Sequence, residues 1–149
     1  ELRPTKDPRT WDWSEHANFV RGWLDYMVEY ENDGSIRGML LESWEANEDA
    51  TQWTLRLRPG VKWNNGDDFT AEDVVHNLRR WSDGTAEGNS MAARFDVLRD
   101  TSEGGTGQMR EDAVTVVDDL TVQLNASAPD IALVVNMADY PAAVVHQSY

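Results

Sequence analysis

The chain has 149 residues, 40% of them hydrophobic. This length suits one domain that buries roughly two thirds of its unfolded surface. No apolar run approaches the ~18 residues of a transmembrane helix. The 27 Asp and Glu residues outnumber 13 Lys and Arg, and the net charge of −14 argues against nucleic acid or anionic lipid as a partner. The chain has no cysteine, which excludes disulfides, thiolate metal sites and a cysteine nucleophile.

The first part of the chain predicts a loop followed by a helix. Residues 1–14 contain two prolines and two tryptophans without a periodic pattern, so we expect an ordered loop. Residues 15–31 predict a helix with one buried stripe, because apolar side chains recur at intervals of three and four. Asn-Asp-Gly at 32–34 ends this helix in a turn. A short extended piece follows around Ile36.

Residues 41–47 and 52–58 predict an antiparallel hairpin. In its second strand apolar and polar side chains alternate, which is typical of a half-buried strand. The inward side chains are Trp53, Leu55 and Leu57, and the solvent-facing ones are Thr54, Arg56 and Arg58. Pro-Gly at 59–60 stops the strand, and Asn-Gly at 65–66 suits a tight turn with positive φ.

The second half of the chain predicts helices mixed with a second hairpin. Thr70 begins a helix that has acidic residues in its first turn and ends at 82–84. Its predicted inward side chains are Val74, Val75, Leu78 and Trp81. A further helix is expected over 89–100, with Met91, Phe95 and Leu98 on one side. The Gly-rich, acidic segment 101–108 predicts a mobile loop.

The last elements that we expect are a hairpin of 113–117 with 120–124, a helix over 131–137 after Pro129, and a strand at 142–145. Helices and hairpins alternate without regular βαβ units. The predicted fold class is therefore α+β.

No motif selects a catalytic or metal site. The three histidines, His16, His76 and His146, are far apart and lack the spacing of zinc ligands. Carboxylate pairs are frequent by chance in so acidic a chain, and no order of residues selects two for a glycosidase. The glycines at 104–107 lack the Lys-Ser/Thr of a P-loop. We expect no catalytic residues, no metal and no cofactor.

Two of the seven tryptophans in the chain are candidates for a binding cleft. Trp23, Trp44, Trp53 and Trp81 fall on apolar stripes and are expected in the core. Trp11 and Trp13 lie in the irregular opening segment, where an aromatic side chain either lines a binding cleft or covers the core. A stand-alone carbohydrate-binding or protein-interaction module that uses exposed tryptophans is therefore an alternative function. A hydrolase with paired carboxylates is a third.

Three consecutive segments resemble one protein family. They are LLESWE at 40–45, WTLRLRPGVKW at 53–63 and FTAEDVV at 69–75, with Gly66 between the last two. This ordered set resembles the family 5 extracellular solute-binding proteins, which serve ABC transporters of peptides, oligopeptides and nickel. Asp-Pro at 7–8, the segment 24–32, the hairpin at 114–124 and Pro129 extend the resemblance. Gly38 replaces a common proline, and residues 83–108 match poorly.

The resemblance implies a subdomain of the first lobe of a type II periplasmic-binding-protein-like fold, with 1–149 as a single subdomain. Family members are far longer than 149 residues, so the chain is expected to be a fragment that lacks the second lobe. The implied function is capture of a peptide or similar solute, outside the cytoplasm, for delivery to the permease of an ABC importer. This protein would be periplasmic or lipid-anchored, and not an enzyme.

The resemblance also implies the wall of the ligand cleft. The opening loop and the segment 90–95 correspond to regions that face the cleft in the family. The predicted ligand-binding residues are Trp11, Trp13, Met91, Arg94 and Phe95. Arg94 can pair with a ligand carboxylate, although an exposed helical arginine is more often only solvated.

Overall fold

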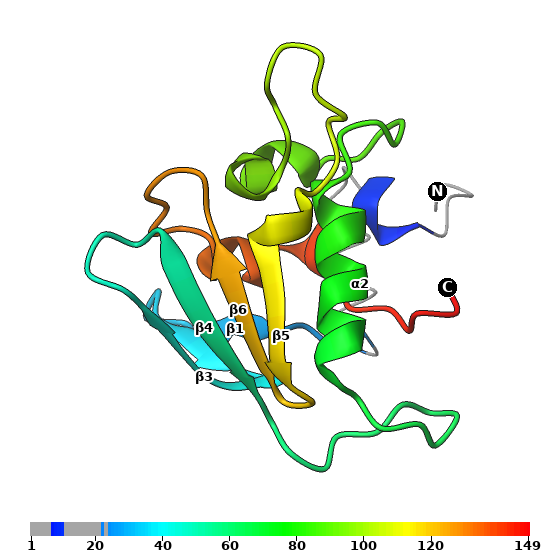
Figure 1. Cartoon of the computed structure of the whole chain (residues 1–149). Helices are drawn as coiled ribbons and strands as arrows, with labels where there is room; N and C mark the ends of the chain where they lie inside the picture. Colours follow the sequence, from blue (N-terminus) through cyan, green and yellow to red (C-terminus); the bar gives the residue numbers. More distant parts are fainter. Residues whose placement is uncertain (1–6, 11–21, 23) are drawn as a thin grey trace.

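A four-stranded antiparallel sheet packed against one α-helix lies at the centre of the fold (Figure 1). The computed structural model describes residues 7–10, 22 and 24–149. The strand order is β3-β4-β6-β5, with β3 at Leu41–Ala46, β4 at Gln52–Leu57, β5 at Val114–Asp118 and β6 at Thr121–Asn125. A two-stranded antiparallel sheet pairs β1 (Val28–Tyr30) with β2 (Ile36–Gly38).

The α-helix of the described residues is α2 (Ala71–Ser82), and short 3-10 helices supply the other helical turns. These are η1 (Pro8–Thr10), η2 (Ala92–Leu98), η3 (Glu111–Ala113), η4 (Val135–Ala138) and η5 (Tyr140–Ala142). The α+β class and the antiparallel hairpins predicted from the sequence are confirmed.

The β3–β4 hairpin has the predicted alternation. Trp53, Leu55 and Leu57 are buried in the core, while Arg56 and Arg58 are exposed. Leu55 pairs with Trp44 on β3 and with Val122 on β6, so β4 is a central strand that buries one face. Figure 1 shows α2 on the side of the sheet that these apolar residues face.

The sequence around Thr70 fixes where α2 begins. The buried carboxylate of Asp73 accepts a hydrogen bond from the Thr70 backbone N–H (3.0 Å) and one from Trp63 Nε1 (3.1 Å). This satisfies one of the donors that a helix N-terminus leaves unpaired. Val74, Leu78 and Trp81 point into the core as predicted.

The predicted helix over 15–31 is wrong in its described part. Residues 28–30 form strand β1, in which Val28 pairs with Gly38 of β2. The backbone carbonyl of Met27 accepts hydrogen bonds from the N–H groups of Met39 and Leu41, at 3.1 and 3.0 Å. These bonds and the pairing with β2 outweigh the local apolar periodicity. The predicted turn at 32–34 is present, and Gly34 has φ of 87°.

The predicted strand at 142–145 is also wrong. Here the backbone bonds to a side chain rather than to a neighbouring strand. Val145 N–H donates to Asn77 Oδ1 (2.9 Å), and Asn77 Nδ2 donates to Val145 C=O (2.7 Å). Residues 131–137 form turns and then η4, and 89–100 contain the kinked 3-10 helix η2, where α-helices were expected. The segment 89–100 still buries Met91, Phe95 and Leu98 as predicted, whereas Ile131 at the start of the other segment is exposed.

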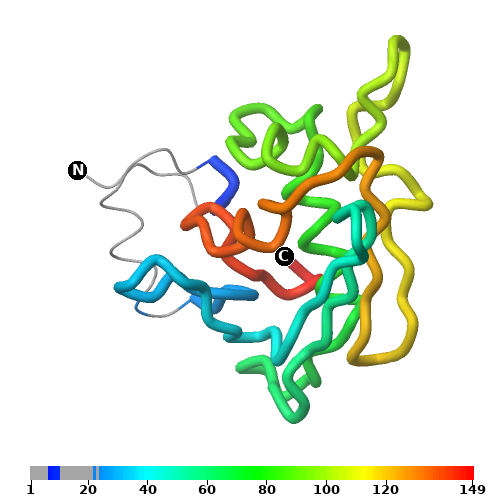
Figure 2. The backbone as a smooth tube through the Cα atoms, turned by 90° about the vertical axis from the view of Figure 1, so that its left-hand side faces the viewer, coloured from blue at the N-terminus to red at the C-terminus, as the bar shows by residue number. Residues whose placement is uncertain are grey.

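The loop predicted at 101–108 extends away from the rest of the chain (Figure 2). A backbone bridge between Arg99 and Met109 closes its base. The Asp100 carboxylate accepts hydrogen bonds from Ser102 Oγ (2.6 Å) and from the Thr106 backbone N–H (3.3 Å). Within the described residues, no helix is both long enough and apolar enough to cross a lipid bilayer.

Candidate functional site

The predicted ligand-binding residues occupy different environments. Trp11 and Trp13 lie outside the described residues. Met91 and Phe95 are fully buried, and the Phe95 ring stacks on Trp81 with centroids 5.7 Å apart. Arg94 lies between them in sequence but points outward. Within residues 91–95, the structure therefore exposes the Arg94 side chain and buries the side chains of Met91 and Phe95 in the core.

Arg94 makes an ion pair at the surface formed by η2 and η5. Its Nη1 is 2.6 Å from Asp139 Oδ2, and the exposed fractions of the two side chains are 49% and 18%. Asn136 Nδ2 donates to the Arg94 backbone carbonyl at 3.0 Å, which joins η2 to η4. The guanidinium has further donors, so this pair leaves capacity for a second acceptor.

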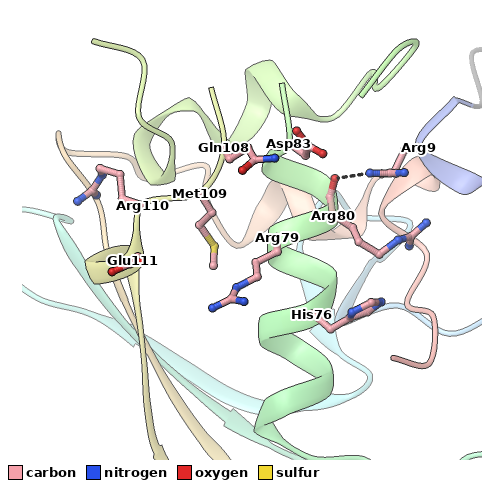
Figure 3. A pocket seen from close by; sticks show the side chains of 9 residues that line it. All are labelled: Arg9, His76, Arg79, Arg80, Asp83, Gln108, Met109, Arg110 and Glu111. Carbon is pink, nitrogen blue, oxygen red and sulfur yellow. Dashed lines mark hydrogen bonds between the residues drawn. The ribbon is translucent and has the colours of Figure 1, made fainter. Parts of the chain in front are cut away.

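A cavity of about 380 Å³ extends across the outer face of α2, the face turned away from the core (Figure 3). Its volume is in the range of small-molecule sites. The lining residues come from η1, from α2 and from the segment before β5, and four of them are arginines. They are Arg9, His76, Arg79, Arg80, Asp83, Gln108, Met109, Arg110 and Glu111.

Helix geometry divides the cavity into two sides. His76 and Arg80 are four residues apart, as are Arg79 and Asp83, so each pair shares one strip of the helix surface. Figure 3 shows His76 and Arg80 extending to the side where Arg9 lies, and Arg79 extending toward the segment that carries Glu111.

Asp7 connects Arg9 and Arg80. Asp7 Oδ2 is 2.7 Å from Arg9 Nη2, and Asp7 Oδ1 is 3.0 Å from Arg80 Nη2. Burial alone would raise the pKa of Asp7, but the hydrogen bonds from Arg9 and the two positive charges outweigh it and lower that pKa. Burial lowers the pKa of Arg80, which nevertheless stays charged near neutral pH. One carboxylate therefore serves two guanidinium groups.

The end of α2 is held by side chains from outside the helix. Asn89 Nδ2 lies within hydrogen-bonding distance of three carbonyl oxygens, those of Arg80 (3.1 Å), Trp81 (3.1 Å) and Asp83 (2.8 Å). Arg9 Nη1 also donates to the Arg80 carbonyl at 3.2 Å. Positive charge at a helix C-terminus complements the helix dipole. Structural stabilisation thus explains part of the arginine cluster.

His76 lies on α2 beside this cluster. Burial lowers its pKa and the positive charge of Arg80 lowers it further, and these effects outweigh the opposing charge of Asp73. Two buried nitrogen atoms on this side, His76 Nε2 and Arg80 Nη1, have no hydrogen-bond partner within the described part of the chain. Buried polar atoms in folded proteins are normally paired.

A smaller pocket of about 100 Å³ adjoins the C-terminal segment. Trp63 and Phe69 line it together with Val144. The ring of His146 packs edge-on against Trp63, with centroids 5.1 Å apart, and His146 Nε2 is 3.3 Å from Asp67 Oδ2. Lys62 forms an ion pair with Asp68 in the same turn.

The sequence did not predict the cavity on α2. Its residues come from three separated parts of the chain, and Arg9 lies in a segment that shows no periodicity. One signal was available: Arg-Arg at 79–80 in the last turn of a predicted helix is unusual in a chain of net charge −14. No group of three or more potential metal-ligating side chains occurs among the residues that the structure describes.

Comparison with known proteins identifies the family. The profile of the bacterial extracellular solute-binding proteins, family 5 (middle part), matches residues 35–149. The chain belongs to this family. The match includes the β3–β4 hairpin, the turn that follows and α2, which carry the motifs recognised in the sequence.

Curated relatives agree with the family match. The chain is 28% identical over 137 residues to the oligopeptide-binding protein AmiA of Streptococcus pneumoniae, which covers 85% of the chain and 21% of that protein. It is 30% identical over 139 residues to the glutathione-binding protein GsiB of Pectobacterium atrosepticum, with 93% of the chain and 24% of that protein covered.

Solved structures share the fold. Listeria monocytogenes OppA bound to peptide superposes with a TM-score of 0.81 at 25% identity, over 99% of this chain and 29% of that one. The fold is therefore that of part of a periplasmic binding protein, as the sequence predicted. The chain spans less than a third of the length of each of these three proteins.

The described tryptophans do not favour the alternative binding module. Trp53 and Trp81 are buried, and Trp44 and Trp63 pack against the core. None of the exposed large hydrophobic residues of the described chain is a tryptophan. Trp23 lies outside the described residues.

Proposed function

We propose that this chain is part of the first lobe of a solute-binding protein that captures peptides, or a similar small solute, for an ABC importer. The family match over residues 35–149 is the observation that carries the proposal. The names of the relatives support the substrate class, since AmiA is an oligopeptide-binding protein and GsiB a glutathione-binding protein.

In this proposal 1–149 is a single subdomain and a second lobe, outside the chain, completes the binding site. Closure of two lobes over a ligand shifts the population from open to closed, and the closed form delivers the solute to the permease. The protein works outside the cytoplasm, in the periplasm or attached by a lipid anchor. It binds its solute without chemical turnover.

Arg94 is the residue of the described chain that we assign to the cleft wall. Its guanidinium is accessible, and a bidentate pair with a ligand carboxylate is stronger than a neutral hydrogen bond. Asp139 holds the guanidinium in place and leaves further donors free. Met91 and Phe95 support the same surface from beneath, because their side chains are buried. Trp11 and Trp13 complete the proposed set.

Calorimetry on the protein at its natural full length tests this function. A panel of peptides of two to five residues should contain ligands that bind with one-to-one stoichiometry. Arg94→Ala and Trp11→Ala should each weaken binding at least several-fold. The matched control is Arg56→Ala, because Arg56 is also an exposed arginine with one carboxylate partner, Glu45.

Each possible result has a defined meaning. Unchanged affinity in the Arg94 or the Trp11 variant would remove that residue from the site while leaving the family function intact. Absence of binding by every peptide, metal chelate and sugar tested on the folded full-length protein would contradict the proposed function.

A further inference from the structure

The outer face of α2 holds two unpaired polar atoms that point to a ligand. His76 Nε2 and Arg80 Nη1 are buried, belong to consecutive turns of one helix strip and line the same cavity of about 380 Å³. Neither atom has a partner within the described residues. Arg80 Nη1 is a donor, and His76 Nε2 is a donor in the tautomer protonated at that nitrogen. A buried donor without an acceptor costs free energy, so an acceptor at this position would stabilise the protein.

Guanidinium donors are concentrated beside these two atoms. Arg9 and Arg80 share the carboxylate of Asp7, and Asp83, which also lines the cavity, acts on Arg9, so these two guanidinium groups face two carboxylates. The Tyr149 ring lies 4.9 Å from Arg80 Cζ and covers one side of the guanidinium. Partial burial weakens solvent screening of that charge. Four arginines thus line one cavity of a chain whose net charge is −14.

We propose that the His76–Arg80 side of this cavity binds an oxyanion, a carboxylate or a phosphate group, that accepts hydrogen bonds from Arg80 Nη1 and His76 Nε2. Arg9, from η1, supplies additional positive charge (Figure 3). Guanidinium groups suit such ligands because their N–H donors match the geometry of two oxygen atoms. Glu111 lines another part of the cavity, where it disfavours the anion, and the Asp83 carboxylate interacts with Arg9, which leaves Arg80 Nη1 as the main donor to the oxyanion.

This site goes beyond the proposed function and does not depend on it. Arg94 and its partner Asp139 belong to η2 and the start of η5, and neither lines the cavity. Loss of peptide binding in the Arg94 variant and loss of oxyanion binding on α2 are therefore separate outcomes.

A histidine titration on the full-length protein tests the proposal. The His76 ring resonance is followed by NMR while inorganic phosphate or acetate is added at constant ionic strength. We expect a saturable shift and a rise of about 1 unit in the pKa of His76, because an anion next to the imidazole favours its charged form. His146 and Asp73 both act on His76, so His146 is the internal comparison and should shift by much less than His76. If only phosphate produces a saturable shift, the ligand group is assigned as a phosphate. If acetate produces it, the ligand group is assigned as a carboxylate.

Paired variants locate the site. Arg80→Gln should weaken oxyanion binding at least tenfold, whereas Arg79→Gln, which removes the same charge from the adjacent position, should change it less than twofold. His76→Leu provides a second test if loss of the Asp7–Arg80 pair prevents folding of the Arg80 variant. The proposal is overturned if neither anion produces a saturable shift of the His76 resonance, since the cavity would then hold only water. It is equally overturned if His76 and His146 shift together or if the Arg79 and Arg80 variants lose binding equally.

Discussion

The central sheet and the segments that flank it are held by different kinds of interaction. In the sheet, the β3–β4 and β5–β6 hairpins pair strands adjacent in sequence, and backbone pairing of β4 with β6 joins the two hairpins. Of the flanking segments 24–30 and 139–149, the first pairs locally with β2, and both also form backbone bonds that do not belong to the sheet. Val144 N–H donates to the Asp25 carbonyl at 3.0 Å, and Val145 bonds to the Asn77 side chain.

This difference indicates that the central sheet and α2 position the flanking segments. The sheet and α2 contain their own hydrogen-bond partners and most of the core, so their conformation follows from local pattern and burial. The flanking segments take their conformation from groups on the sheet and on α2. Substitutions in the sheet or in α2 should therefore reduce the free energy of unfolding of the whole chain. Substitutions at the contacts between the two regions should detach the flanking segments from the sheet and α2.

The largest expected effect is in the core between α2 and η2. Trp81 is fully buried and stacks on Phe95, so Trp81→Ala should reduce the free energy of unfolding by about 4 kcal/mol. Chemical denaturation measures this change. The control Trp81→Phe keeps an aromatic ring and should lose about 1 kcal/mol. Equal losses in the two variants would show that ring stacking and volume do not dominate at this position.

The second effect concerns the contact between the two regions. Asn77→Leu removes both hydrogen bonds to Val145 and leaves the buried backbone N–H and C=O of Val145 without partners. We expect a loss of about 3 kcal/mol in the free energy of unfolding. In the control, Asn64→Ala changes an exposed asparagine and should shift stability by less than about 0.5 kcal/mol.

Hydrogen exchange sharpens this test. If Asn77 positions the C-terminal segment, the amide of Val145 should lose protection in the Asn77→Leu variant while the amides of β4 keep theirs. Uniform loss of protection across both regions would contradict the separation between them.

A third, smaller effect tests the contact of the C-terminal segment with the turn that follows β4. His146→Ala removes the edge-on packing against Trp63 and should cost about 1 kcal/mol. A double-mutant cycle with Trp63→Leu isolates the interaction between the two rings. Strictly additive losses would show that this ring contact does not hold the segment.

The smallest effect is expected on the open face of the sheet. Arg56 forms an exposed ion pair with Glu45 at 2.8 Å, and Arg56→Ala should change the free energy of unfolding by at most about 0.5 kcal/mol. The measurement is repeated at high salt, where the difference should decrease further. A loss above about 1 kcal/mol would show that this arginine contributes more to the central region than a solvated pair does.

Sequence pattern predicted the two hairpins and α2 because their partners are close in the chain, but not the β4–β6 pairing that joins the hairpins. Alternation in β4 and the acidic first turn after Thr70 each reflect a local rule. Near Val28 the spacing of apolar residues suggested a helix, but the deciding hydrogen bonds come from residues 36–41. At Val145 the partner is a single side chain on α2. No single-sequence pattern describes such a contact.

The candidate sites show the same limit. The prediction of a cleft wall at 90–95 came from the family resemblance. Of the predicted ligand-binding residues that the structure describes, only Arg94 is exposed. The cavity on α2 requires η1, α2 and the segment before β5 to be brought together. The sequence shows the charges of these segments but not their proximity.

Analysis of the bound solute is the most direct test of the solute-binding function. The protein at its natural full length is purified without refolding and then denatured, and the released small molecules are identified by mass spectrometry. We predict short peptides, or another single class of small solute, released in amounts close to one per protein molecule. No released solute, together with no thermal shift across panels of peptides, sugars and metal chelates, would contradict the account.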